Sequence, residues 1–184
     1  MDEIHLLERI RAGDSDAFDA VFRANYAALV GSAERILGRR DVAEEIVQDV
    51  MLELWRRRET LAVEDSLRGY LFRATRNRSL NHLRHGAIEK RAEPELAANR
   101  AESGSSAHAA LVEEEIEVAV KRAVADLPAR CREVFELSRM HGLRYSEIAT
   151  TLGISVKTVE AQMGKALRLL RERLAQWLPD SRST

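Results

Sequence analysis

The chain has 184 residues and a formal net charge of −1, with 45% hydrophobic and 32% charged residues. These values are typical of a globular protein, and the length suffices for one or two small domains with hydrophobic cores. Three prolines, nine glycines and 5% aromatic residues favour an all-α protein over a β-sandwich or barrel. No run approaches the ~18 apolar residues of a membrane span, and the acidic start "MDEIHLLERIRAGD" does not resemble a signal peptide. Because Cys131 is the single cysteine, no internal disulfide can form, and we expect a cytoplasmic location.

Charge is distributed unevenly along the chain. Residues 1–65 have a balance of −6 and residues 92–126 a balance of −5. Residues 66–91 carry +6, and residues 155–173 carry +3. Two basic segments in an otherwise acidic chain indicate a polyanionic partner, while the surrounding acidic residues suppress indiscriminate binding.

Helical periodicity dominates the first half of the chain. The predicted elements are one or two helices over residues 14–38, a helix over 41–58, a short loop, and a helix over 66–85. Asp14 or Ser15 can cap the first of these helices, and Ser66 can cap the last.

The composition changes after residue 86. Residues 94–110 contain Pro, Gly and Ser residues without a sustained apolar period, which is typical of a linker. Helical periodicity resumes near residue 111 and continues to about Trp177, with interruptions at Pro128, "HGLR" and "LGIS". We therefore expect two small helical domains joined by a flexible linker, over residues 1–93, 94–110 and 111–184.

The segment "DVAEEIVQDVMLELW", residues 41–55, predicts an amphipathic helix with two distinct faces. Its core stripe consists of Ala43, Ile46, Val47, Val50, Met51 and Leu54. The opposite face holds Asp41, Glu45, Gln48 and Leu52. A leucine in an acidic face, flanked by Trp55, suggests a docking surface for a basic partner helix. The alternative is an ordinary solvated acidic face.

The segment "YLFRATRNRSLNHLRH", residues 70–85, combines arginines with aromatic rings. One stripe of this helix contains Tyr70, Arg73, Asn77, Asn81 and Arg84, and Arg76 and Arg78 lie nearby. Apolar residues on both sides of the stripe, up to Leu80 and Leu83, predict that the helix packs on two sides. Arginines beside aromatic rings can hold phosphates and stack on unpaired bases. Alternatively, the asparagines bond to a neighbouring helix and Tyr70 packs against the preceding one.

The segment "YSEIATTLGISVKTVEAQMGKALRLLRERL" indicates a helix-turn-helix. Ala149 permits a close helix crossing, Gly153 supplies the turn, and Val159 packs back onto the first helix. Ser155 is a good N-cap for the second helix, which is expected to enter the major groove of DNA. The residues expected to face outward are Lys157, Thr158, Ala161, Gln162, Lys165 and Arg168. Lys and Arg can contact phosphates, whereas Thr and Gln can reach base edges. A helical hairpin with a solvated basic face is the alternative.

Taken together, these segments resemble bacterial sigma factors of the sigma-70 class, in their small extracytoplasmic-function (ECF) group. "DVAEEIVQDVMLELW" resembles the helix of that family that binds core RNA polymerase. "LRGYLFRATRNRSLNHLRH" resembles its promoter −10 region, and the segment from "ADLPARCREVF" onward resembles its −35-binding domain. The three segments stand in the order that the family has, over about 130 residues.

The resemblance implies a sigma factor that binds core polymerase and directs promoter recognition and transcription initiation. It assigns core binding to Asp41, Glu45, Gln48, Asp49, Leu52 and Trp55. It assigns −10 binding and melting to Tyr70, Arg73, Arg76, Asn77, Asn81 and Arg84. It assigns −35 binding to Arg144, Ser155, Lys157, Thr158, Ala161, Gln162, Lys165 and Arg168. Family members are often held inactive by an anti-sigma protein, which adds such an inhibitor to the partners to be considered.

The sequence departs from the family pattern at a few positions. Met51 stands where Phe is usual, Tyr70 where Trp is common, and Asn81 where Asp is common. These changes keep size or polarity and bear on promoter preference more than on class. Arg144 replaces the usual Ser or Thr cap, which weakens that cap and adds a candidate phosphate contact.

Two other functions remain open from the residues alone. An ordinary helix-turn-helix regulator with a helical sensor domain would explain the C-terminal motif but not residues 41–85. An enzyme is not expected: His82 and His85 could bind a metal, but no further ligand has fitting spacing. No Gly-rich phosphate loop is present either. We expect neither a cofactor nor a metal site.

Overall fold

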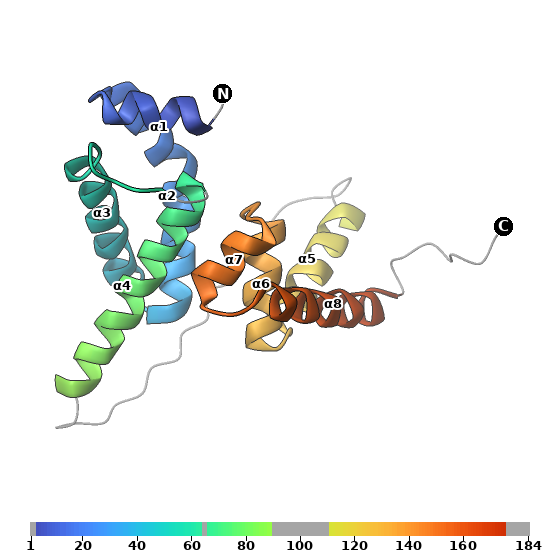
Figure 1. Ribbon diagram of the computed structural model, residues 1–184. Coiled ribbons are helices and arrows are strands. Elements are labelled where there is room, and N and C mark those ends of the chain that lie inside the picture. The colour runs from blue at the N-terminus through green and yellow to red at the C-terminus, as the bar shows by residue number, and fades with distance from the viewer. Residues whose placement is uncertain (1–2, 64–65, 90–110, 176–184) are drawn as a thin grey trace. The chain divides into compact units, whose positions relative to one another are not determined.

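The computed structural model describes residues 3–63, 66–89 and 111–175 (Figure 1). Its described residues form eight helices and no strand, which confirms the predicted all-α fold. The helices are α1 (Glu3–Arg11), α2 (Ser15–Leu37), α3 (Arg40–Arg56), α4 (Leu67–Glu89), α5 (Leu111–Ala125), α6 (Ala129–Arg139), α7 (Tyr145–Leu152) and α8 (Val156–Arg173).

Helix α1 was not expected from the sequence. Four of its nine residues are apolar, and among residues 5–11, whose burial is described, Ile10 is the one that is fully buried. A short helix of this kind gains its stability from packing, here against α2, more than from its own periodicity.

The chain divides into two compact units. The first contains α1–α4, and the second contains α5, α6, α8 and most of α7. The predicted linker, residues 94–110, lies outside the described residues, and the predicted domain boundaries stay a prediction.

In the first unit α2 packs against both α3 and α4, and α3 packs against α4 (Figure 1). All six residues of the predicted α3 core stripe are buried, which confirms the helical wheel of that segment. They face buried residues of α2 such as Val21, Leu29 and Val30. The outer face of α3 is thereby fixed, because a helix of this pitch directs the intervening positions to solvent.

Local capping defines the helix ends of this unit. The Asp14 carboxylate accepts hydrogen bonds from the backbone N–H groups of Asp16 and Ala17, so Asp14 is the N-cap of α2. An ion pair with Arg9 and these bonds hold the pKa of Asp14 below its usual value. The Ser66 hydroxyl accepts from the backbone N–H of Gly69 at 2.9 Å, which confirms Ser66 as the cap of α4.

Helix α4 packs differently from the prediction. Its buried face contains Leu71 and Phe72 together with Thr75 and Ser79, whereas Leu83 is 42% exposed. The expectation that Leu83 packs on a second side was therefore wrong. Burial of Ser79 is tolerated because its hydroxyl donates to the carbonyl of Thr75, so that this polar atom is satisfied within the helix.

In the second unit α8 packs against α6 and α5. One buried cluster of this unit consists of Ala123, Leu127, Cys131, Ala166 and Leu170. Helices α7 and α8 are separated by a three-residue turn that begins at Gly153, whose φ of 67° lies in the left-handed region. Ala149 and Val159 are both buried, so the predicted helix-turn-helix is confirmed. No helix in the described part of the chain is both long and apolar enough to cross a lipid bilayer.

Candidate functional site

The outer face of α3 is acidic around one exposed leucine. Asp41, Glu45 and Gln48 are exposed, and Leu52 is 43% exposed. Asp41 pairs with the Arg39 guanidinium, and this pair together with the backbone N–H of Val42 lowers the pKa of Asp41. The predicted docking surface therefore exists as an exposed face that carries acidic side chains and one exposed leucine.

Trp55 lies at one edge of that face and is only half-buried. Its ring packs against Phe18 of α2, with 5.2 Å between ring centroids. The Arg58 guanidinium lies 4.7 Å from the Trp55 ring centroid. These contacts fix the orientation of the indole, so that one part of it stays available at the surface.

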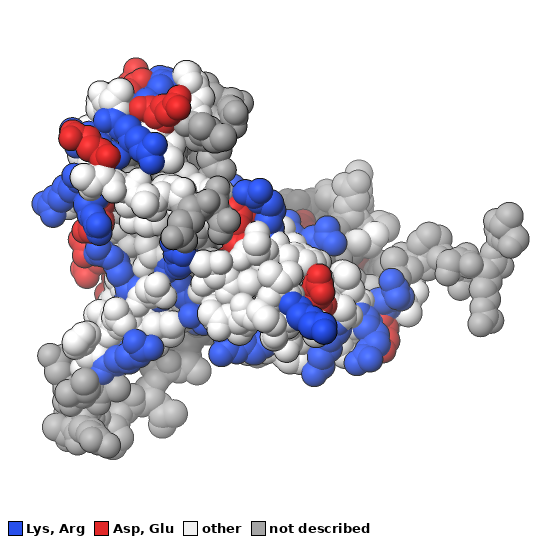
Figure 2. Space-filling model, in the orientation of Figure 1, with Lys and Arg blue, Asp and Glu red and all other residues white. Residues whose placement is uncertain are grey.

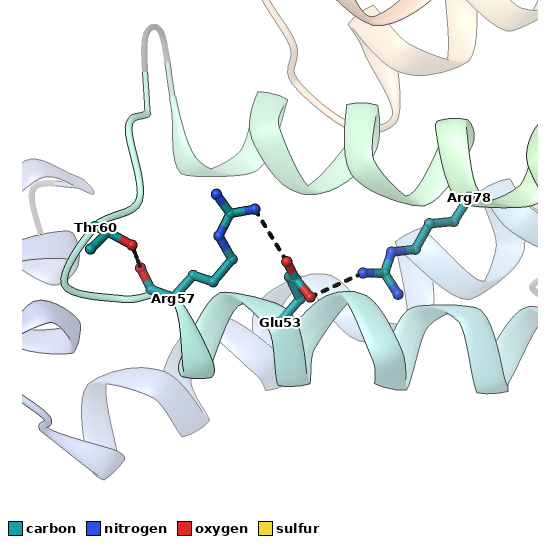
Figure 3. A network of polar contacts seen from close by, with 4 residues as sticks. All are labelled: Glu53, Arg57, Thr60 and Arg78. Atoms are coloured by element: carbon teal, nitrogen blue, oxygen red, sulfur yellow. Dashed lines mark hydrogen bonds and ion pairs between the residues drawn. The ribbon is translucent and has the colours of Figure 1, made fainter.

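Asp49 lies toward the opposite edge, next to α4. The Arg78 guanidinium is 3.7 Å from the Asp49 carboxylate and 3.3 Å from that of Glu53. Glu53 also pairs with Arg57 at 3.2 Å, so one carboxylate of α3 lies between two arginines (Figure 3). Arg78 thus joins α4 to α3, and Asp49 is part of an internal network as well as of the outer face.

The predicted α4 stripe is present, but its members differ in exposure. Tyr70 and Arg73 are half-buried, whereas Asn77, Asn81 and Arg84 are exposed. Arg84 donates to the Asn81 side-chain oxygen at 3.0 Å. Arg76, outside the stripe, is also half-buried.

Tyr70 stands in the first turn of α4. Its backbone N–H donates to the carbonyl of Ser66 at 2.9 Å, directly after the capped start of the helix. Capping makes this turn well defined, because it satisfies donors that otherwise lack a partner. The ring is consequently attached to an ordered helix end that follows a loop.

Arg144 occupies the N-cap position of α7, as expected, and its side chain makes no capping hydrogen bond there. Glu147 compensates: its carboxylate accepts from the backbone N–H of Arg144 at 2.7 Å and lies 3.4 Å from the Arg144 guanidinium. The Glu147 side chain is 4% exposed and that of Arg144 is 70% exposed. The cap therefore comes from Glu147, and the charged end of Arg144 reaches solvent.

Helix α8 presents a basic outer face. Figure 2 shows Lys and Arg side chains gathered along the surface that α8 forms. Lys157, Ala161, Lys165 and Arg168 are exposed as predicted. Arg168 has a distant pairing with Glu172, at 3.9 Å between two exposed side chains.

The start of α8 is fixed by hydroxyl groups. Ser155 is confirmed as the N-cap, because its hydroxyl oxygen accepts from the backbone N–H of Thr158 at 3.1 Å. The two hydroxyl groups of Ser155 and Thr158 also lie 2.8 Å apart, in hydrogen-bonding contact. Both are exposed, so they combine a capping role with access to solvent.

Gln162 differs from its neighbours on α8. It is half-buried, and its side-chain oxygen accepts a hydrogen bond from the buried Cys131 thiol of α6 at 3.0 Å. This differs from the outward position predicted for Gln162 from the sequence. The structure shows that one end of its carboxamide is bound to the core of the unit.

Sequence reasoning missed two residues that organise these faces. Glu53 holds Arg78, and Glu147 caps α7. A glutamate three residues after an N-cap is a known capping signal and could have identified Glu147. His82 and His85 are exposed on α4, and within the described residues no three His, Cys, Asp or Glu side chains are grouped to bind a metal.

Comparison with known protein families matches both units. Residues 21–87 match the model of sigma-70 region 2, and residues 117–170 match that of sigma-70 region 4. Together the two models cover more than half of the chain, and they fall on α2–α4 and α5–α8.

Curated relatives carry the same class of name. RNA polymerase sigma-H factor of Pseudomonas aeruginosa is 25% identical over 187 aligned residues, covering 96% of this chain and 95% of its own. ECF RNA polymerase sigma factor SigL of Mycobacterium tuberculosis is 29% identical and covers 90% of this chain and 95% of its own.

Solved structures share the fold. CnrH, in complex with the cytosolic domain of CnrY, matches with a TM-score of 0.59 and 23% identity, over 95% of this chain and 97% of the matched chain. RpoE of Bartonella quintana, in complex with the anti-sigma factor NepR, matches with a TM-score of 0.58 and 23% identity, over 86% and 96%. The chain therefore belongs to the sigma-70 family of RNA polymerase sigma factors, in its extracytoplasmic-function group.

Proposed function

We propose that this sigma factor divides its work between three exposed helix faces. The outer face of α3 binds core RNA polymerase, the stripe of α4 binds and melts the −10 element, and the outer face of α8 binds the −35 element. The observation that carries the proposal is the opposite character of two faces: acidic with one exposed leucine on α3, basic on α8.

The α3 face suits a basic helix of a protein partner. Leu52 supplies exposed apolar area on this face, and Gln48, Glu45 and Asp41 follow one another along the helix on its N-terminal side. Apolar centres with polar rims are the common pattern of protein interfaces. The negative charge of the same residues disfavours direct contact with DNA, which separates this face from the other two.

The α4 stripe suits unpaired DNA. Tyr70 offers a partly exposed ring, with Arg73 on the same stripe. Stacking of a base on an aromatic ring contributes ~1–3 kcal/mol, which is comparable with the few kcal/mol that unstacking a base costs. Capture of an extruded base of the non-template strand then favours opening of the duplex.

The α8 face suits duplex DNA in the major groove. Lys165 and Arg168 lie on the exposed surface and contact phosphates without regard to sequence. Thr158 and Gln162 supply the hydrogen-bonding groups that approach base edges. Arg144 adds a further phosphate contact from the start of α7.

Affinity for DNA without polymerase should be low. The net charge of the whole chain is −1, and the excess of positive charge is concentrated in two segments. Few phosphates can therefore be neutralised until polymerase contributes its own basic surface. The chain acts in the cytoplasm on this proposal, and catalysis belongs to the polymerase.

An anti-sigma protein is a further proposed partner. RpoE, one of the matched structures, is held in complex with an anti-sigma factor. By this analogy, an inhibitor would occupy surfaces of this chain that polymerase or promoter DNA need. An inhibitor that covers the α3 face would compete with core polymerase for this chain, and a binding assay in solution would detect that competition.

The test is run-off transcription with purified core polymerase and fragments of genomic promoters. We expect specific transcripts only when the chain and core are both present, and co-purification with core in the absence of DNA. A chain that binds promoter DNA tightly by itself and fails to bind core would instead be an ordinary helix-turn-helix regulator, and the proposal would be wrong.

A further inference from the structure

One hydrogen bond connects the buried core of the second unit to the DNA-facing side of α8. Cys131 of α6 is 1% exposed and belongs to the apolar cluster with Leu127, Ala166 and Leu170. Its thiol lies 3.0 Å from the side-chain oxygen of Gln162. The thiol is thus a polar donor inside an apolar cluster, directed at a residue of the recognition helix.

The bond determines which end of the Gln162 carboxamide remains available. A thiol has one hydrogen to donate and is a weak acceptor, so it pairs best with an oxygen. The carboxamide oxygen is bound in this way, and the amide nitrogen with its two hydrogens is the other end of the same planar group. Gln162 consequently faces its surroundings as a hydrogen-bond donor.

We propose that Cys131 is a positioning residue for promoter recognition, which orients Gln162 so that its amide donor faces the −35 element. This inference rests on the proposed role of α8. A glutamine that is free to use both ends reads adenine through N7 and N6, accepting from one and donating to the other. Because its oxygen is turned toward the buried thiol, Gln162 presents its amide nitrogen at the outer side of the carboxamide, and it favours base edges that offer acceptors.

The base preference that follows is specific. Guanine offers acceptors at N7 and O6 of the major groove, and thymine offers O4. Adenine loses its advantage because the oxygen of Gln162 no longer accepts from N6. Cytosine offers a donor there and is disfavoured. We therefore expect guanine or thymine at the base that Gln162 approaches.

The hydroxyl pair of Ser155 and Thr158 is independent of Cys131, so the effect of a Cys131 substitution on Gln162 can be measured separately. Thr158, the other candidate for base contact, has its hydroxyl within 2.8 Å of that of Ser155 at the start of the helix. This pair is formed by residues of the helix start and does not involve α6. Substitution of Cys131 therefore leaves the capping arrangement of α8 in place.

The experiment measures the sequence preference of the holoenzyme, assembled from the full chain and core polymerase, on promoter fragments randomised in the −35 element. Gln162→Ala identifies the base by removing the preference at one position. Cys131→Ala releases the carboxamide, and preference there should move toward adenine by about five-fold, the factor for one hydrogen bond of ~1 kcal/mol. Cys131→Ser keeps a donor and should restore the wild-type preference.

Two further variants separate positioning from loss of packing. Val134→Ala removes volume from a fully buried position of α6 without any hydrogen bond to α8, and should leave the preference unchanged. Gln162→Glu leaves the core intact, keeps an acceptor for the thiol and removes the outward donor. It should favour cytosine at that position, because a carboxylate accepts from its N4 amino group.

The outcomes distinguish this inference from the function on which it rests. If the wild-type holoenzyme showed no sequence preference in the −35 element, the proposed role of α8 would be wrong, and this inference would be wrong with it. A clear wild-type preference that Cys131→Ala leaves unaltered would overturn the inference alone. So would a preference that Gln162→Ala does not affect, or one that Val134→Ala changes as much as Cys131→Ala does.

Discussion

Helices α4 and α8 are both basic, yet their charged side chains have different surroundings. Arg78 of α4 is engaged by Glu53 and Asp49 of α3. On α8, Lys157 and Lys165 are exposed, and no acidic side chain in the described part of the chain pairs with either of them. The comparison shows that a basic segment can hold a fold together or bind a polyanion, and that net charge alone does not distinguish the two.

The difference also separates the proposed roles. On α4 the stripe offers the half-buried ring of Tyr70 and exposed amides, which suit stacking and hydrogen bonding to an opened strand, and Arg84 adds one exposed charge. On α8 the exposed groups include lysines and an arginine, which suit the phosphates of a closed duplex. On the proposed function both helices depend on the α3 face, because without polymerase neither has enough charge to bind DNA well.

The largest effect is expected from Leu52→Lys, which places a positive charge in the proposed polymerase interface. Affinity for core should fall at least about ten-fold, the loss expected at a central interface residue, while the melting temperature stays nearly unchanged. Transcription from every promoter should fall together. The matched control is Leu167→Lys on α8, where a leucine of similar exposure, 38%, should tolerate the change without loss of core binding.

Equal losses of core affinity in the two lysine variants, measured by titration of labelled core, would contradict the assignment of α3. An unfolded Leu52→Lys variant would mean that the exposed face had been misidentified. In either case the proposal that α4 and α8 both need polymerase bound at the α3 face would lose its support.

Charge reversal should lower the stability of the fold when made on α4 and weaken promoter binding when made on α8. Arg78→Glu places three acidic groups together, and we expect it to destabilise the first unit by about 1 kcal/mol, since such partly exposed pairs contribute little each. Lys165→Glu should leave the melting temperature unchanged and weaken promoter binding. Both variants should be tested by thermal unfolding and by promoter binding of the holoenzyme. A stable Arg78→Glu variant together with a destabilised Lys165→Glu variant would contradict the comparison.

A smaller effect is expected from Arg168→Ala on α8. If Arg168 contacts a phosphate, the variant should weaken all −35 sequences alike and reduce the slope of log affinity against log salt by about 1. Thr158→Ala should instead change the order of preference among promoters. A salt titration that shows an unchanged slope, or a library in which Arg168→Ala changes the preferred sequence, would argue against a phosphate contact.

The smallest effect concerns pH, because the two units begin key helices with different caps. Asp14 caps α2 as a carboxylate whose pKa is lowered, whereas Ser155 caps α8 with a hydroxyl. A lowered pKa in the folded state contributes stability that is present above the unfolded value of about 3.9. That stability is lost as the pH falls through the folded value. Hydrogen exchange at the start of α2 should therefore increase in acid, and that at the start of α8 should not.

Asp14→Asn is the matched variant for that measurement. Asparagine also caps helices well but does not titrate, so exchange at the start of α2 should lose most of this pH dependence. If acid exposes the starts of α2 and α8 equally in the wild type, protonation of Asp14 is not the cause.

Local patterns allowed most of the fold to be predicted. The stripe of α3, the caps Asp14, Ser66 and Ser155, and the turn at Gly153 follow from residues within a few positions of each other. The partner of Arg78 is 25 residues away, and that of Gln162 is 31 residues away. A helical wheel contains no information on such contacts, because it describes one helix and not the helix beside it.

The same reason explains the error on α4. The wheel treated Leu83 as a packing residue because it is apolar, whereas the buried face uses Thr75 and Ser79. The Ser79 hydroxyl bonds within the helix, whereas the buried Thr75 hydroxyl has no hydrogen-bond partner among the described residues. The roles assigned to individual residues for polymerase and promoter stay predictions.

The most direct test of the division between α4 and α8 is permanganate footprinting of open complexes on two templates, one fully duplex and one premelted at the −10 element. Tyr70→Ala should retain core and −35 binding, open the duplex template slowly, and recover on the premelted template because the cost of unstacking has been removed. Lys165→Ala should be weakened equally on both templates. A Tyr70→Ala variant that is destabilised and equally defective on both would contradict the account, since the ring would then serve packing and not melting.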